Sequence, residues 1–289
     1  MRSSESAAGI VTFNPDIPRL RENLLSIVNQ VTTVLVVDNG SSNFDKVASI
    51  VADFPNVELT GNASNGGIAK ALNQIMAWAA PSTQWVLLLD QDTVVMSGMV
   101  KLLEAHKGPL IGIVAPTVVD RSMEPPSAAL ASAVVSEEDY CITSGSLCNV
   151  EAWNRSRGYD EKMFIDFVDF DYCLRLRLLG YRILRDPRAV ILHEIGKITR
   201  HGPFTAYHYS AFRSYHMARD MLYYSRKHRT SPTTLRVHKR GILATYATLF
   251  RKMLVVALFE EDRVRRIAAL SRGITSGTFS GHHARRSDS

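Results

Sequence analysis

Two carboxylates stand one residue apart in this chain, Asp90 and Asp92 with Gln91 between them. They follow the unbroken apolar run Trp85–Leu89, which is typical of a buried strand. Such a strand delivers two oxygen ligands to the carboxyl edge of a sheet, where open α/β folds bind their ligands. Two hard anionic ligands beside a phosphate site suit Mg²⁺ or Mn²⁺ bridging to a nucleotide pyrophosphate. Several enzyme classes place acids this way, so the pair alone leaves the reaction open.

A second acidic group lies downstream, in the segment 164–175, where Asp166, Asp169 and Asp171 alternate with aromatic residues. An acid held among aromatic rings is desolvated and becomes a more capable base. The first turn of a helix also favours acids through the macrodipole. Solvation of a helix end does not require three aromatic side chains, however, so we interpret this segment as functional.

Four further groups stand at predicted strand ends or helix starts: Thr12–Asn14, Asp38–Ser41, Asn65–Asn73 and His193. Each has an ordinary explanation when taken alone, as a tight turn, a glycine turn or a loop histidine. An aspartate after a strand can also accept hydrogen bonds from a base or a ribose hydroxyl. Glycines at a helix start let backbone N–H groups approach an anion. His193 becomes a candidate metal ligand if the fold brings it near Asp92.

Alternating strands and helices must position these groups. The pattern predicts strands over 8–13, 33–37, 57–60 and 85–90, with helices between them, the third over 68–79. Successive βα units favour a mostly parallel sheet with helices on both faces. The second half is less regular, with predicted strands over 110–115, 140–150 and 189–192, a loop-rich stretch over 116–138, a helix over 164–179 and helices after about 203.

Composition narrows the protein class. The 289 residues are 46% hydrophobic and 21% charged, which suits a globular chain with a real core. Residues 1–8 are polar and run into the first strand, so we expect no secretory signal and a cytoplasmic protein. The three cysteines, Cys141, Cys148 and Cys173, have no C-x-x-C spacing, which predicts reduced thiols and neither a disulfide framework nor a zinc site.

Charge is distributed unevenly along the chain. Residues 1–200 hold 18 Lys and Arg against 23 Asp and Glu, whereas residues 201–289 hold 16 against 5. A basic C-terminal region indicates contact with an anionic membrane or with nucleic acid, and a merely solvated tail remains an alternative. No nucleic-acid module is recognisable, which favours the membrane. The apolar segment 242–259 is interrupted by Arg251-Lys252, so it suits an interfacial helix or a helix packed in its own domain or a dimer better than a membrane span.

Taken together, the motifs resemble family 2 glycosyltransferases of the GT-A fold, and more narrowly bacterial rhamnosyltransferases. The resemblance covers roughly the first 230 residues. It rests on V-T-F-N-P at 11–15, V-V-D-N-G-S at 36–41, N-G-G-I-A-K-A-L-N at 65–73, L-L-L-D-Q-D-T at 87–93, T-S-G-S at 143–146, F-I-D-F-V-D-F-D-Y-C-L-R at 164–175 and H-E-I-G at 193–196. It implies an α/β GT-A domain over 1–200, with a nucleotide-sugar half to about 95 and an acceptor half beyond it, and a basic helical region over 201–289.

The resemblance also implies roles for single residues. Asp92 and His193 would ligate Mg²⁺ or Mn²⁺, and Asp169 would be the general base. Donor-binding roles fall on Thr12, Asn14, Asp38, Asn65, Gly66, Lys70, Asp90 and Gln91, with Asp38 reading the pyrimidine base and Asp90 near the ribose. Acceptor-side roles fall on Ser144, Gly145, Asp166 and Asp171; the last of these is Glu in many relatives.

The implied reaction is inverting, metal-dependent transfer of L-rhamnose from dTDP-β-L-rhamnose to a hydroxyl of a glycan or lipid-linked glycan, in cell-surface or cell-wall polysaccharide synthesis at the inner face of the plasma membrane. Homo-oligomerisation through the C-terminal helices stays open, as does a donor with another dTDP- or UDP-linked sugar. The alternative from another class is a haloacid-dehalogenase-like phosphatase, in which Asp90 would be the nucleophile. That motif normally follows the first strand of its fold, whereas here several βα units precede it.

Overall fold

The computed structural model describes residues 5–121, 134–194, 198–201, 204–207, 209–231 and 241–279. The described residues fall within two compact units, Met1–Glu161 with Tyr172–Glu194, and Lys162–Asp171 with Ile195–Ser289. The unit boundary crosses helix α6 (Val168–Leu178). The predicted division at residue 200 stays a prediction, and the segment Lys162–Asp171 groups with the C-terminal unit.

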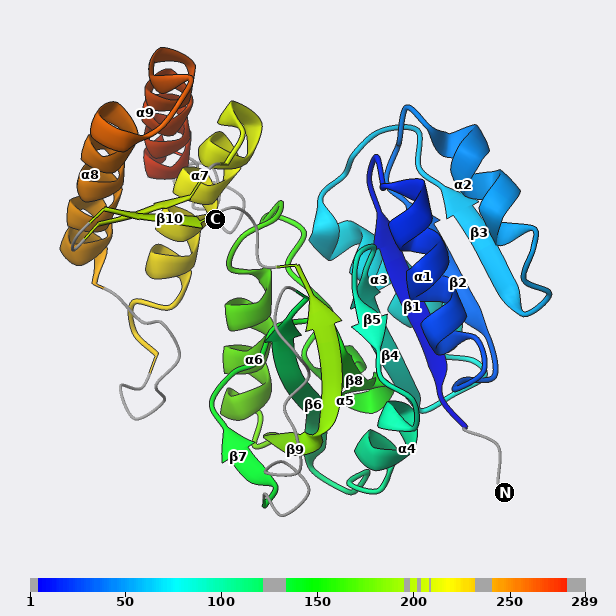
Figure 1. Cartoon of the computed structure of the whole chain (residues 1–289). Coiled ribbons are helices and arrows are strands. Elements are labelled where there is room, and N and C mark those ends of the chain that lie inside the picture. The colour runs from blue at the N-terminus through cyan, green and yellow to red at the C-terminus, as the bar shows by residue number, and fades with distance from the viewer. Residues whose placement is uncertain are drawn as a thin grey trace, which may run out of the picture. The chain divides into compact units, whose positions relative to one another are not determined.

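A nine-stranded sheet organises the first unit (Figure 1). Its strands are β1 (Ala7–Thr12), β2 (Val34–Asp38), β3 (Val57–Gly61), β4 (Trp85–Asp90), β5 (Val94–Val95), β6 (Ile111–Asp120), β7 (Ser136–Glu138), β8 (Ser146–Asn149) and β9 (Arg182–His193). The order is β3-β2-β1-β4-β8-β6-β9-β5, and β7 also pairs with β9. Strands β1, β2, β3, β4, β6 and β9 run in one direction, because β8 is antiparallel to both β4 and β6. The sheet confirms the predicted mostly parallel α/β class.

Helices cover both faces of this sheet. They are α1 (Ile17–Ile27), α2 (Phe44–Val51), α3 (Ile68–Ala79), α4 (Met99–Glu104), α5 (Val150–Arg155) and the second part of α6. Even-numbered β1 residues such as Ile10 pack with α1 and α2, whereas Gly9 faces α3, as the two-residue period of a strand requires. A Cβ on Gly9 would lie 2.1 Å from Ile75 Cγ2, so glycine is what lets α3 approach the strand.

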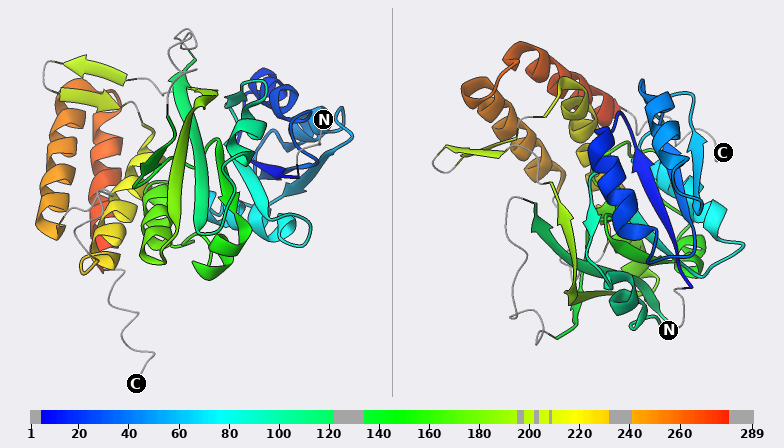
Figure 2. Two further views of the ribbon diagram at one scale, coloured as in Figure 1. Left: turned by 90° about the horizontal axis from the view of Figure 1, so that it is seen from below. Right: turned by 45° about the vertical axis from the view of Figure 1, so that its right-hand side comes forward.

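The second unit contains a hairpin and three helices: β10 (Ile198–His201), β11 (Phe204–Tyr207), α7 (Ala211–Lys227), α8 (Ile242–Phe259) and α9 (Arg263–Phe279). Its small core is formed by Met217, Ala218, Leu222, Leu249, Val256 and Leu270. Helix α9 packs closely on α7 because a Cβ on Gly273 would lie 2.3 Å from the carbonyl oxygen of Tyr215. Both views in Figure 2 show α8 and α9 side by side, with α8 at the edge of the three-helix group.

Several elements differ from the predicted ones for identifiable reasons. Strand β6 continues past Pro116 because a register shift between Ala115 and Thr117 accommodates the proline, and β9 begins at Arg182 because it pairs along β6. Helix α6 begins at Val168 rather than at residue 164, since Phe167 has a φ of 67°. The hairpin β10–β11 and the short strands β5 and β7 were not predicted, and residues 122–133 of the loop-rich stretch lie outside the described residues. The three cysteines are free and buried, as predicted.

Candidate active site

The first site residues meet where β1, β2 and β4 end. In the register of the sheet, Thr12 stands opposite Asp38, and Val11 stands opposite Asp90. Because parallel strands place their carboxyl ends at one edge, the loops that follow them become neighbours. The side chain of Gln91 ties two of these loops together, since its Oε1 accepts a hydrogen bond from the backbone N–H of Phe13 at 2.7 Å.

Asp38 organises the turn after β2. Its carboxylate is fully buried and accepts hydrogen bonds from Thr12 Oγ1 at 2.9 Å, from the N–H groups of Gly40 and Ser41 at 3.1 and 2.8 Å, and from Ser41 Oγ at 2.5 Å. These bonds satisfy both carboxylate oxygens within the protein. The contact with a pyrimidine base that we predict for Asp38 would require some of them to be exchanged, and it stays a prediction.

Asn14 links the first and second loops. It adopts a φ of 47°, and its Oδ1 accepts hydrogen bonds from both the backbone N–H and the hydroxyl of Ser42, each at 2.8 Å. Its own N–H donates to Ser41 Oγ at 2.7 Å. A non-glycine residue in the left-handed region is uncommon, and asparagine tolerates it better than most. The strained residue therefore joins two loops at the predicted donor side of the edge.

The glycine turn before α3 is held by Asn39, a member of the predicted group Asp38–Ser41 to which the sequence assigned no role of its own. Nearly all of Asn39 is buried, and its Nδ2 donates to Asn65 Oδ1 at 3.0 Å and to the carbonyl of Gly67 at 3.1 Å. Its Oδ1 accepts from the N–H of Gly66 at 3.2 Å. Lys70 is exposed in the first turn of α3, and its Cδ would lie 2.8 Å from a Cβ on Gly66. The predicted donor residues Asn65, Gly66 and Lys70 therefore belong to one turn.

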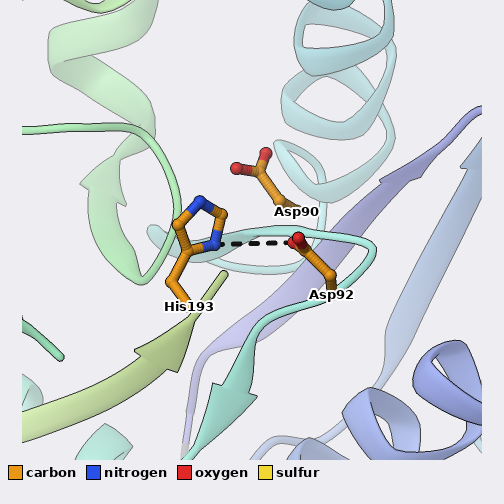
Figure 3. Close-up of side chains that lie close together, drawn as sticks. All are labelled: Asp90, Asp92 and His193. Carbon is orange, nitrogen blue, oxygen red and sulfur yellow. Dashed lines mark ion pairs between the residues drawn. The ribbon is translucent and has the colours of Figure 1, made fainter. Parts of the chain in front are cut away.

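Three potential metal ligands converge at this edge: Asp90, Asp92 and His193, here called the Asp–His cluster (Figure 3). One potential ligand atom from each lies within 4.8 Å of the others. His193 Nδ1 is 3.5 Å from Asp92 Oδ1, and the side chains of His193 and Asp92 are 20% and 27% exposed. His193 lies at the end of β9, and the fold brings it near Asp92, which is what its role as a candidate ligand requires.

A pair of buried hydroxyl groups lies within hydrogen-bond distance of the Asp–His cluster. Thr93, which is fully buried, places its Oγ1 3.1 Å from His193 Nδ1 and 2.7 Å from Ser144 Oγ. Ser144 Oγ also accepts a hydrogen bond from the backbone N–H of Asp90 at 3.0 Å. Within the part of the chain that the structure describes, His193 Nε2 has no hydrogen-bond partner. The geometry thus holds the ring by Nδ1 and leaves Nε2 available to a ligand.

The donor set of the Asp–His cluster suits a divalent cation. Two carboxylates supply hard oxygen ligands, and an imidazole adds a nitrogen of the kind that Mn²⁺ accepts as well. Two partly buried carboxylates side by side repel each other unless a cation lies between or beside them. Arg121 is a fixed cation near the cluster, but its Nη1 donates to the backbone carbonyl of Asp92 at 3.1 Å and its guanidinium pairs with Glu22. The residues present therefore fit a bound Mg²⁺ or Mn²⁺.

Two of the predicted acceptor-side residues lie beneath the cluster. Ser144 is 2% exposed, and Gly145 is buried with a φ of 81°. A Cβ on Gly145 would lie 2.7 Å from Pro116 Cγ, and its N–H donates to the carbonyl of Leu88 at 2.7 Å. Their surroundings assign both residues a part in shaping the turn after β4, and a direct contact with an acceptor stays a prediction.

The other predicted acids lie in the second unit, in residues 164–171, here called the acidic segment. Asp169 is partly exposed in the first turn of α6, where the positive partial charge of the helix end favours a carboxylate. Phe167, with its positive φ, packs against the rings of Phe170 and Tyr224 at centroid distances of 5.7 and 5.3 Å. Asp166 pairs with Arg213 of α7 at 3.4 Å.

Helix α7 holds this segment through buried charges. Asp171 is fully buried, and one of its carboxylate oxygens lies 2.6 Å from Lys227 Nζ and 2.7 Å from His228 Nε2. Asp220, also fully buried, accepts hydrogen bonds from the N–H groups of Phe164 and Ile165 at 2.8 and 3.2 Å. Burial raises the pKa of Asp220, although Arg219 and these backbone donors oppose the rise. The burial of Asp171 favours a positioning role over contact with an acceptor.

Comparison with known proteins identifies the family. The sequence pattern of glycosyl transferase family 2 matches residues 8–185, more than half of the chain. The chain belongs to this family. The matched range contains every predicted donor and acceptor residue as well as Asp92, and it ends before His193. Glycosyltransferase activity, predicted from the motifs, is confirmed at this level.

Individual relatives agree with the family. The chain is 27% identical over 210 residues to the dTDP-rhamnosyl transferase RfbF of Shigella flexneri, covering 67% of this chain and 70% of the relative. Its fold is similar to that of the mannosyltransferase PcManGT from Pyrobaculum calidifontis in complex with GDP-Man and Mn²⁺, with a TM-score of 0.60 and 16% identity over 97% of this chain and 88% of that one. It is also similar to TarS of S. aureus in complex with UDP-GlcNAc, with a TM-score of 0.56 and 15% identity over 94% and 81% of the chains. These likenesses confirm the GT-A fold.

Family membership also decides against the phosphatase alternative. In that class the D-x-D pair follows the first strand, whereas β4 is the fourth strand along this chain. The pair also has a histidine from β9 beside it rather than a further acid-rich motif. Asp90 is therefore interpreted as part of a glycosyltransferase site and not as a phosphoryl-accepting nucleophile.

Proposed function

We propose that this glycosyltransferase is metal-dependent and inverting, and that it transfers L-rhamnose from dTDP-β-L-rhamnose to a hydroxyl of a glycan or lipid-linked glycan acceptor. The similarity to a dTDP-rhamnosyl transferase over two thirds of the chain carries the choice of donor. The convergence of Asp90, Asp92 and His193 supports the metal dependence. The acceptor would belong to cell-surface polysaccharide synthesis at the inner face of the plasma membrane.

Donor binding would use the edge formed by β1, β2 and β4. Thr12, Asn14 and Asp38 would surround the nucleoside, and the turn of Asn65 and Gly66 with Lys70 would lie along the donor. Asp90 would lie near the ribose, and Gln91 would also contact the donor. Glycines at the start of α3 leave room for backbone N–H groups to reach an anion, and Lys70 is exposed beside them.

Asp92 and His193 would hold the divalent ion, with Thr93 fixing the imidazole. When bound, the ion supplies positive charge that stabilises the departing nucleoside diphosphate. Asp169 would accept the proton of the acceptor hydroxyl. The acceptor oxygen forms the new bond to the anomeric carbon, while the bond from that carbon to the diphosphate oxygen breaks and dTDP leaves with the electron pair. A single displacement inverts the anomeric centre, so a β-linked donor yields an α-L-rhamnoside.

Asp166 and Asp171 would support this base from the acidic segment. Arg213 and Lys227 hold their carboxylates in the second unit. Fixing the two flanking acids restricts the conformations open to Asp169, which lies between them in sequence. Restricting a general base in this way lowers the entropic cost of reaching the reactive geometry.

A donor panel tests the proposal. Purified protein would be assayed with dTDP-rhamnose, other dTDP-sugars, UDP-sugars and GDP-mannose, each with Mg²⁺, Mn²⁺ or a chelator. We expect release of dTDP from dTDP-rhamnose above all other donors, and loss of that release with the chelator. Preference for another sugar nucleotide would overturn the rhamnose assignment while leaving the family assignment intact.

Variants separate the two groups of acids. Asp92→Ala should reduce turnover about a hundredfold or more and weaken Mn²⁺ binding. Asp169→Asn should reduce transfer by about 10²–10⁴-fold while leaving Mn²⁺ binding unchanged. Asp53→Ala is the matched control, because Asp53 is an exposed carboxylate of the first unit paired with Arg21.

A further inference from the structure

Helix α8 is apolar on two opposite faces. One face packs into the second unit through Thr245, Leu249, Val255 and Val256. The other face is exposed: Leu243 is 82% exposed, Phe250 63%, Leu254 47% and Leu258 61%. A helix that needs only one apolar face for its own packing should carry polar residues on the other. The exposed apolar face of α8 is therefore unexplained by the packing of the second unit.

These residues form one continuous stripe. Leu243, Phe250, Leu254 and Leu258 are spaced by seven, four and four positions, and the exposed Ala247 fills the gap, so all five lie within one narrow sector of the helix. We call them the α8 stripe. Helix α8 has 18 residues, with a mean hydropathy of 1.7 and 22% of its residues buried, so by length and composition it could cross a membrane.

The charged pair Arg251-Lys252 argues for a helix lying along a membrane surface rather than across it. Lys252 is on the packed side, with its Nζ 5.2 and 5.1 Å from the ring centroids of Tyr207 and Tyr209. Burial lowers the pKa of Lys252 to about 8, with Asp166 and Glu260 opposing the shift. Arg251 is exposed at the border of the α8 stripe. A membrane span would break the packing on one side of the helix. It would also place a cation in the bilayer core, which is energetically costly.

The charged residues near the α8 stripe indicate which kind of surface it contacts. Arg251 flanks it, and Arg263, Arg265 and Arg272 are exposed on the neighbouring helix α9. Glu261 and Asp262 in the intervening turn are also exposed, but residues 201–289 as a whole carry 16 basic residues against 5 acidic ones. Large apolar side chains beside arginines are the composition of helices that bind anionic bilayers, where the rings and leucines enter the acyl boundary and the cations meet phosphates.

We propose that the α8 stripe is a membrane-docking face that inserts Phe250, Leu254 and Leu258 into the interfacial layer of an anionic bilayer. This inference deepens the proposed function, because a lipid-linked acceptor would be presented at such a surface. It depends on residues of the second unit alone. Vesicle binding can therefore fail or succeed independently of sugar transfer.

Vesicle co-sedimentation tests the docking face. The full chain would be mixed with phosphatidylcholine vesicles with or without phosphatidylglycerol, at low and high salt. We expect binding to the anionic vesicles that weakens with salt. Leu254→Asp and Phe250→Asp should each weaken it about tenfold or more, because a charge replaces an exposed apolar side chain that would enter the bilayer. Leu25→Asp is the matched control: Leu25 is a 57% exposed leucine on α1, in the first unit, and its loss should leave binding unchanged.

Three results would overturn the docking face. The first is wild-type protein that does not bind anionic vesicles. The second is a Leu254→Asp or Phe250→Asp variant that binds them as well as wild type does. Light scattering that shows a stable dimer in wild type and a monomer in Leu254→Asp would assign the stripe to a second copy of the chain. Circular dichroism verifies that each variant is folded, and dTDP release from free donor reports separately on the proposed function.

Discussion

The Asp–His cluster and the acidic segment both present carboxylates, but the protein positions them in different ways. In the first unit, Asp90 and Asp92 sit on a turn shaped by hydroxyl and backbone hydrogen bonds from Thr93 and Ser144. In the second unit, Asp171 is buried, and one of its carboxylate oxygens lies against Lys227 and His228 at the end of α7. The first arrangement leaves the side chain of Asp92 partly exposed, so a cation from solution can reach it. The second pairs its carboxylate with a lysine of the protein itself.

That difference distinguishes carboxylates that bind a metal ion from carboxylates that position a neighbouring base. A carboxylate that must take up a metal ion needs accessible oxygens and weak internal partners, and the side chain of Asp92 is 27% exposed. A carboxylate that positions a neighbouring base needs strong fixed partners, and the side chain of Asp171 is 1% exposed. Variants in the two regions should therefore affect different quantities, with ion affinity changing in the first unit and conformational stability in the second.

Asp171→Asn should have the largest effect on stability, about 3 kcal/mol, because it leaves Lys227 without its buried counter-charge and takes the carboxylate partner from His228. All three tryptophans, Trp78, Trp85 and Trp153, lie in the first unit, so their fluorescence reports on that unit. We expect the urea midpoint followed by circular dichroism at the helical band to fall, with a smaller change by fluorescence. Asp53→Asn, at an exposed ion pair, is the control and should change stability by less than about 0.5 kcal/mol. Equal effects of the two substitutions would contradict the distinction between the regions.

His216 should make the second unit sensitive to acid. Burial, reinforced by Arg219, lowers the pKa of His216 to about 4 from an ordinary value of 6.5. Between these pH values the unfolded chain binds a proton that the folded chain does not, so stability is lost as pH falls from 6.5 towards 4. The loss should be about 2 kcal/mol at pH 5 relative to pH 8. His216→Phe keeps the stacked contact with Phe164, at 3.9 Å between ring centroids, and should abolish this part of the pH dependence.

The check is unfolding of both proteins at several pH values, followed by circular dichroism. Parallel pH profiles for wild type and His216→Phe would show that other groups cause the acid sensitivity. A flatter profile for the variant would confirm that the burial of a neutral His216 causes the loss of stability below pH 6.5.

Thr93→Val should have the smallest effect of the three, a loss of about tenfold in Mn²⁺ affinity, because the ring of His193 loses the hydroxyl that orients it. The isosteric methyl keeps the packing, so stability should change little. Thr93→Ser retains the hydroxyl and should retain most of the affinity. Isothermal titration with Mn²⁺ alone, without donor, measures this directly. Unchanged affinity in Thr93→Val would show that Thr93 contributes only packing.

Local patterns predicted the strands and helices around the Asp–His cluster well. Helix α3 spans the predicted residues 68–79, and β4 ends at Asp90 as the apolar run indicated. These elements are encoded by short-range periodicity and by turn residues next to them. The predicted boundaries were wrong where pairing with a distant strand determines them. Strands β6 and β9 pair beyond their predicted ends, and β11 lies where the sequence predicted the start of the helical region.

Long-range contacts in the site could not be predicted from the sequence. Strand β5 pairs antiparallel with β9 so that Val94 stands opposite Leu192, and continuing this register by one residue brings Thr93 to His193. Nothing local to either residue encodes a pairing across a hundred positions. The partners of Asp171 and Asp220 could not be predicted either, because the sequence of a helix does not indicate which distant loop packs against it.

The sequence by itself determined the family, the βα alternation and the identity of the acids at the carboxyl edge of the sheet. Those features depend on the order of residue types along the chain, which one strand or turn can express alone. Only the tertiary structure decided that His193 joins Asp90 and Asp92, that Thr93 and Ser144 lie beside them, and that Asp171 is buried against Lys227 and His228. Those features depend on which distant segments share burial, and burial is a property of the whole folded chain.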